Sequence, residues 1–178
     1  MLSKSTALLS GLLLLFGSAS FADEAQPPFR CPSPPDLKAM GSFHGHQGPF
    51  LVIGARAAEI GLRELKVPSW QLNVLVETML DGPRRCLLDA LQLCSGATLG
   101  RGKIQILSAP DTRIWFIDSK TGASVTLTLN DKAKELIGRL PKFHGPGTDS
   151  EKKVAELAEE ALRLKPDEIW KFQKNQAP

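Results

Sequence analysis

The chain has 178 residues and carries 22 basic and 19 acidic side chains, which gives a formal net charge of +3. A balance this close to neutral gives no reason to expect a nucleic acid or an anionic membrane surface as a partner. The length suits one domain with its own hydrophobic core. Tyrosine is absent, and there are only three cysteines and three histidines, so few residues are available for metal binding or acid–base chemistry.

The first 22 residues have the pattern of a secretory signal peptide. Lys4 precedes an apolar run over residues 7–16, and the small residues Ser20 and Ala22 stand before an expected cleavage site at Asp23. This run is too short to span a bilayer, and no later run is long and apolar enough to do so. We therefore expect a secreted or periplasmic protein with no membrane span after cleavage.

Two regions are expected after the signal peptide at residues 1–22: a proline-rich lead-in over 23–39 and a single domain over 40–174. Cys31 lies in the lead-in. If Cys86 and Cys94 share one helix, they lie about 12 Å apart along its axis. A disulfide cannot span this distance, so any internal bridge would involve Cys31, whose disulfide state the sequence leaves open.

Apolar residues that recur at steps of three and four predict a helix over 49–65, with Pro49 as its first residue. Gly54 lies inside this helix, where glycine costs about 1 kcal/mol relative to alanine. A glycine at such a position indicates close packing. Three further helices are predicted over 83–94, 131–140 and 150–164, and a short last helix begins at Pro166.

Alternating apolar and polar residues predict four strands, over 70–78, 104–108, 113–119 and 123–130. Turn residues separate the last three strands at the spacing of hairpins, which favours an antiparallel meander. The predicted fold class is therefore α+β, an antiparallel sheet packed with helices.

Two of the three histidines, His44 and His46, lie in the glycine-rich segment 42–50, just before the first predicted helix. Ligands on one face of a helix are three or four residues apart, so this His-x-His spacing suits an extended or turning backbone instead. We interpret the pair as half of a metal site. The alternative is that two histidines fell by chance in a polar loop. His144 is a weaker candidate ligand.

A thiol and a carboxylate, Cys86 and Asp89, are three residues apart on the predicted helix 83–94 and can point into the same pocket. The glycine-rich segment 95–103 follows. It is not a phosphate loop, because it precedes a strand rather than a helix and Ile104, not serine or threonine, follows Lys103. A tight turn that brings its backbone close to the histidines is the better interpretation.

Three blocks of sequence carry a family resemblance: Phe43-His44-Gly45-His46-Gln47-Gly48-Pro49, Cys86-Leu87-Leu88-Asp89-Ala90-Leu91-Gln92 and Ser95-Gly96-Ala97-Thr98-Leu99-Gly100-Arg101-Gly102-Lys103. Over residues 40–130 their order and spacing resemble the FmdE family, whose name comes from formylmethanofuran dehydrogenase. Ala97 stands where that family has a cysteine. No residue after Lys142 could supply a C-terminal zinc finger, so the chain resembles an exported, stand-alone member without one.

The resemblance implies a domain that is often dimeric and binds a metal ion, with zinc expected, through His44, His46 and Cys86. Two imidazoles and a thiolate suit zinc and leave a fourth position open. Asp89 and Cys94 are expected as an additional ligand, or Asp89 as the group that orients an imidazole. The remaining expected pocket residues are Glu77, Thr98 and Lys103.

Three functional interpretations remain open. The first is an exported zinc-binding module that serves redox metabolism as an accessory or carrier protein, as a homodimer or with a redox-enzyme or cofactor partner. The alternative is a metal-dependent enzyme that activates water, with Asp89 or Glu77 as base. In the third, Cys86 and Cys94 are ordinary core cysteines. Formylmethanofuran oxidation itself is excluded, because three cysteines cannot hold even one four-thiolate cluster.

Overall fold

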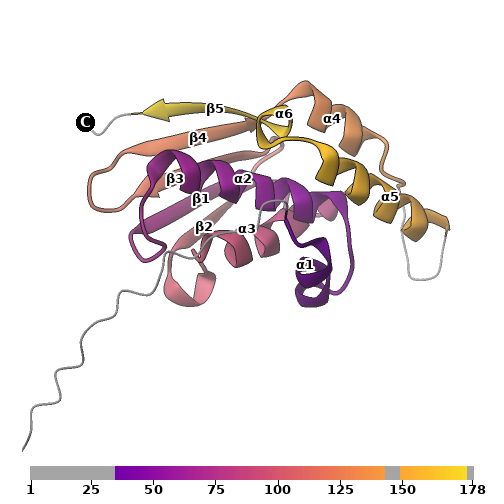
Figure 1. Ribbon diagram of the computed structural model, residues 1–178, viewed down its shortest axis with the longest axis horizontal. Coiled ribbons are helices and arrows are strands. Elements are labelled where there is room, and N and C mark those ends of the chain that lie inside the picture. The colour runs from indigo at the N-terminus through magenta and orange to yellow at the C-terminus, as the bar shows by residue number, and fades with distance from the viewer. Residues whose placement is uncertain (1–34, 143–148, 176–178) are drawn as a thin grey trace, which may run out of the picture.

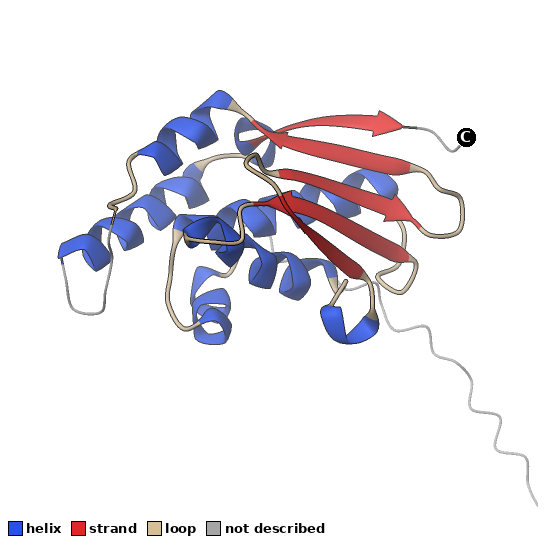
Figure 2. Ribbon diagram, turned by 180° about the vertical axis from the view of Figure 1, so that it is seen from behind, coloured by secondary structure: helices blue, strands red, loops and turns tan. Residues whose placement is uncertain are grey.

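The computed structural model describes residues 35–142 and 149–175. One five-stranded sheet forms one layer, and helices pack against one of its faces (Figure 1). Figure 2 shows the opposite face, with the strands in front of the helices. The α+β fold class is therefore confirmed. The expected signal peptide, Cys31 and His144 lie outside the described residues.

The strand order in the sheet is β2-β1-β3-β4-β5. Four strands lie close to their predicted positions: β1 (Leu72–Thr78), β2 (Ile104–Ser108), β3 (Arg113–Asp118) and β4 (Ser124–Leu129). The pairs β1–β3 and β3–β4 are antiparallel, as the meander requires, but β2 pairs in parallel with β1 rather than with β3. The reason is the helical connection between β1 and β2, which carries the chain back before β2 begins.

A fifth strand, β5 (Trp170–Asn175), pairs antiparallel with β4 and was not predicted. The short helix α6 (Pro166–Ile169) begins at Pro166 as expected but ends after four residues. Five of the six residues of β5 are exposed, so the strand lacks the alternation of a half-buried strand. Its antiparallel pairing with β4, not a burial pattern, defines it.

The first helix, α1 (Leu37–His44), was also not predicted and takes in the last residues of the expected lead-in. Asp36 caps it, because its side chain accepts a hydrogen bond from the backbone N–H of Ala39 at 2.9 Å. The predicted helix 83–94 consists of the 3₁₀ helix η1 (Pro83–Cys86) and α3 (Leu87–Ser95). The others are α2 (Pro49–Leu65), η2 (Leu99–Arg101), α4 (Asp131–Gly138) and α5 (Asp149–Arg163).

Helix α2 lies at the centre of the core, between the sheet, α3 and α5 (Figure 1). Pro49 is its first residue, as predicted. Arg56, whose position in the pattern is outward, is buried. Its guanidinium donates to the carbonyl oxygen of Leu162 at 3.0 Å and to Glu59 at 2.8 Å, so it joins α2 to the C-terminal end of α5. Within the described residues, no helix has the length and apolar character needed to cross a membrane.

The packing of α2 depends on two glycines. A Cβ atom on Gly54 would lie 2.3 Å from the carbonyl oxygen of Leu87, and one on Gly61 would lie 2.3 Å from the ring of Phe116 in β3. The first contact is between backbones, because α3 approaches α2 at the position where α2 has no side chain. The close packing expected at Gly54 is therefore present.

We expect Gly54→Ala to destabilise the protein by about 1–3 kcal/mol, although alanine is the better helix former, because the added methyl group would displace the backbone of α3. The free energy of unfolding from denaturant titration measures this change. Gly138→Ala is the matched control: a Cβ atom there meets no atom within 4 Å, so its stability should equal or slightly exceed that of the wild type. Equal stability of Gly54→Ala and the wild type would contradict the packing.

Candidate metal centre

The two histidines lie on either side of a helix end. His44 is the last residue of α1, and Gly45 caps that helix in a left-handed conformation with φ of 98°. This conformation favours glycine and reverses the chain. His46 follows at once, three residues before α2 begins. The imidazole rings of His44 and His46 lie 4.6 Å apart between centroids and are tilted by 47°. The turn expected before α2 is therefore the junction of two helices.

Cys86 comes from the other half of the site. It is half-buried and is the last residue of η1, directly before α3. One ligand atom from each of His44, His46 and Cys86 can be chosen so that all three lie within 4.8 Å of one another. Three such donors around one point match the ligand set of an open, four-coordinate zinc site.

Asp89 fixes the orientation of one imidazole. Nδ1 of His44 lies 2.6 Å from Oδ2 of Asp89, and the Nδ1–H group donates to the carboxylate. In the neutral ring this leaves Nε2 as an unprotonated electron-pair donor. Nε2 is buried and has no hydrogen-bond partner among the described residues. A buried polar atom without a partner costs about 1–3 kcal/mol, and a metal ion would supply the missing partner. The donor set therefore fits a metal.

The thiol of Cys86 lies in a mixed electrostatic environment. Burial raises its pKa, the positive charge of Arg85 opposes this shift, and the negative charge of Asp89 adds to it. A metal binds the thiolate, so metal binding at Cys86 would release a proton.

A cavity of about 400 Å³ surrounds these groups, and we call it the metal pocket. Its size is in the range of small-ligand sites. Sequence reasoning named His44, His46, Cys86 and Asp89 and missed the other lining residues, which are Arg85, Leu88, Gln92, Leu99 and Ile106. Gln92 belongs to the second of the three blocks that carry the family resemblance. Its Oε1 accepts from the backbone N–H of Leu99 at 3.0 Å, which brings the turn at 95–103 to the pocket.

The remaining predicted site residues lie elsewhere. The described residues that line the metal pocket do not include Glu77, Thr98, Lys103 or Cys94. Glu77 lies 3.8 Å from Arg113, and Lys103 donates to Asn73 at 3.2 Å. Glu77 and Asn73 alternate along β1 with buried residues, so their side chains point to the opposite face of the sheet. The carbonyl of Thr98 closes the turn before β2, and Cys94 is a buried free thiol in the core.

The fold and the site together define an α+β domain with a candidate His/His/Cys metal centre. A family model described as "FmdE, Molybdenum formylmethanofuran dehydrogenase operon" matches residues 43–171. This match covers most of the sequence, and the chain belongs to the FmdE family. No curated protein matches the chain.

A solved structure supports the fold. It is the crystal structure of a tungsten formylmethanofuran dehydrogenase FmdE-like protein from Syntrophus aciditrophicus, which is 21% identical. The similarity covers 80% of this chain and 71% of that chain, with a TM-score of 0.55. At this identity the similarity shows the same fold.

We expect Asp89→Ala to weaken metal binding by about 10- to 100-fold, because the substitution removes the carboxylate that orients His44. Competition with a chelating dye measures the affinity. Asp81→Ala is the control, since Asp81 is exposed and does not line the metal pocket. If both variants bind metal as tightly as the wild type, Asp89 does not orient a metal ligand.

Proposed function

We propose that this FmdE-family protein binds one zinc ion through His44, His46 and Cys86 and works outside the cytoplasm as an accessory or carrier protein. The observation that carries the proposal is the meeting of three ligand atoms within 4.8 Å beside the unpartnered, buried Nε2 of His44. Two imidazoles and one thiolate match the preference of zinc. Three protein ligands leave one coordination position for a ligand that can be exchanged, as a carrier needs.

A metal-dependent enzyme is the second candidate, and the cavity of about 400 Å³ around the group favours it. An enzyme that activates water would also need a base close to the reacting atoms. Among the described residues that line the metal pocket, Asp89 is the one carboxylate, and it already accepts the hydrogen bond from His44. Glu77 lies on the other face of the sheet. The carrier role is therefore the better supported of the two.

The family description refers to the operon of a redox enzyme, which supports a role in redox metabolism. A redox-enzyme or cofactor partner, and assembly as a homodimer, stay predictions from the family resemblance.

We expect the purified protein to contain about one equivalent of zinc per chain, and Cys86→Ala and His46→Ala to lose most of it, because each variant leaves two protein ligands. Elemental analysis after dialysis measures the zinc content. Cys94→Ala is the matched control, since it removes the other described thiol, which lies in the core outside the group.

Two results would contradict the proposal: equal zinc in Cys86→Ala and Cys94→Ala, or no metal in the wild type after loading with zinc. X-ray absorption on the loaded protein separates the two roles from a structural one. Two imidazoles, one thiolate and one exchangeable light atom support the carrier or the enzyme. Four protein ligands would indicate a closed structural site.

The proposed export has its own test. We expect the protein produced from its full gene in a bacterial host to appear outside the cytoplasm with Asp23 as its first residue, because residues 1–22 have the pattern of a cleaved signal peptide. Intact mass spectrometry of the periplasmic fraction measures this. A chain that keeps residues 1–22 and stays in the cytoplasm would contradict export.

A further inference from the structure

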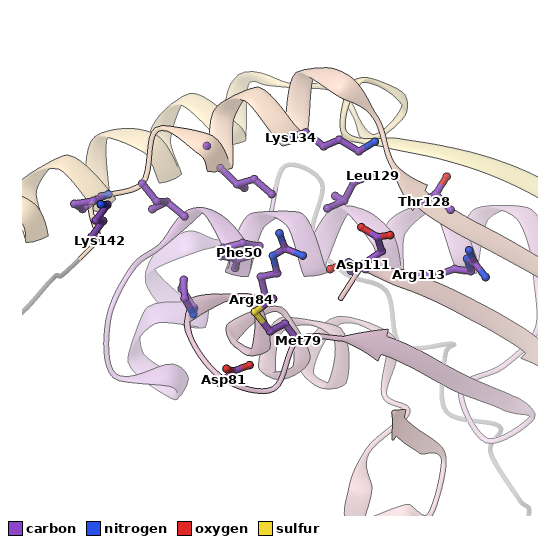
Figure 3. Close-up of a pocket in the computed structure, with 16 residues that line it drawn as sticks. Phe50, Met79, Asp81, Arg84, Asp111, Arg113, Thr128, Leu129, Lys134 and Lys142 are labelled. Carbon is purple, nitrogen blue, oxygen red and sulfur yellow. The ribbon is translucent and has the colours of Figure 1, made fainter. Parts of the chain in front are cut away.

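A second, larger cavity lies away from the metal pocket. It has a volume of about 690 Å³, and α4, the segment after β1 and the turn before β3 form its walls (Figure 3). We call it the basic cleft, because its charged lining residues are Arg84, Arg113, Lys134, Lys142, Asp81 and Asp111. The volume is in the range of small-molecule sites, and the two cavities have no lining residue in common.

Arg84 is the most enclosed of these charges. It is half-buried, whereas the other five charged residues are exposed. Water and salt screen exposed charges strongly and enclosed ones less, so the potential inside the cleft is set mainly by Arg84. The two opposing carboxylates, Asp81 and Asp111, lie on the screened rim.

The guanidinium of Arg84 is held in place before any ligand arrives. Its Nη1 donates to the carbonyl oxygen of Pro110 at 2.6 Å. Figure 3 shows the side chain extending toward Phe50. One hydrogen bond to a neutral carbonyl leaves further N–H donors and does not neutralise the charge. A fixed guanidinium of this kind suits a carboxylate or a phosphate, which it can bind through two parallel hydrogen bonds.

The opposite wall of the cleft is apolar. Phe50 and Leu129 are buried, and Ile137 and Leu140 are partly buried and pack against the core. An inorganic ion would not use such a wall, whereas an organic molecule would remove it from water. The wall and Arg84 together therefore select a molecule with an anionic group and an apolar body.

We propose that the basic cleft is a binding site for an organic anion, whose carboxylate or phosphate binds Arg84 and whose apolar part packs on Phe50 and α4. Lys134 and Lys142 lie at the edge of the cleft and add to the attraction. The site is independent of the metal centre, so it does not depend on the proposed function.

The test is a titration of the ¹⁵N-labelled protein, freed of metal by a chelator, with hexanoate, hexyl phosphate and uncharged hexanol, followed by NMR. We expect at least one of the two anions to shift the amide signals of Arg84 and of α4, with hexanol at least about tenfold weaker. The stronger anion identifies the group as carboxylate or phosphate. Arg84→Gln should weaken binding of that anion about tenfold or more, and Lys134→Gln by less.

Controls separate the cleft from other sites. Lys171→Gln removes a charge on β5 that does not line the cleft, and His44→Ala disables the metal pocket, so both variants should bind the anion like the wild type. Circular dichroism shows whether Arg84→Gln folds, and Lys134→Gln tests the cleft if it does not. The proposal is overturned if neither anion shifts these signals at millimolar concentration, if hexanol binds equally well, or if His44→Ala abolishes binding.

Discussion

The backbone contact between Gly54 and Leu87 determines how the two halves of the metal centre meet. Leu87 directly follows Cys86, and Gly54 lies five residues after Pro49, where the histidine segment enters α2. Because a Cβ atom on Gly54 would lie 2.3 Å from the carbonyl oxygen of Leu87, any larger residue would separate α2 from α3. The thiol and the imidazoles would then move apart, although neither carries the substitution.

The C-terminal part of the chain holds α2 from its other side. The indole Nε1–H of Trp170 donates to the carbonyl oxygen of Ile53 at 2.9 Å in the core, one residue before Gly54. Arg56 binds the carbonyl oxygen of Leu162 at the end of α5. These contacts join α2 to segments more than a hundred residues away in the sequence. The family model extends to residue 171, which agrees with a domain whose central helix needs its last strand.

The sequence predicted features that depend on local patterns and missed those that depend on distant partners. The start of α2 at Pro49, the packing at Gly54 and the hairpin of β3 and β4 follow from residues close in the chain. β2 lies beside β1 because a helical connection returns the chain, which no turn signal records. α1 was missed because prolines dominate the segment before it, although Asp36 is a good N-cap.

The same division holds for the candidate site. Motif spacing singled out His44, His46, Cys86 and Asp89, whereas their mutual distances and the burial of Nε2 depend on the packing of α1 against α3. The position of Glu77 was open to prediction from the sequence: it alternates with Val76 and Thr78, whose side chains point into the core. A residue of that parity in β1 points away from the helices, so strand alternation alone would have removed Glu77 from the pocket.

The short helix η1 connects the two cavities. A 3₁₀ helix has about three residues per turn, so its neighbouring residues point in different directions. Arg84 accordingly lines the basic cleft, while Arg85 and Cys86 line the metal pocket. An anion on Arg84 and a metal ion on Cys86 would both restrict this four-residue segment. If both need the same conformation of η1, each raises the affinity for the other by the same factor, because coupling between two binding sites is reciprocal.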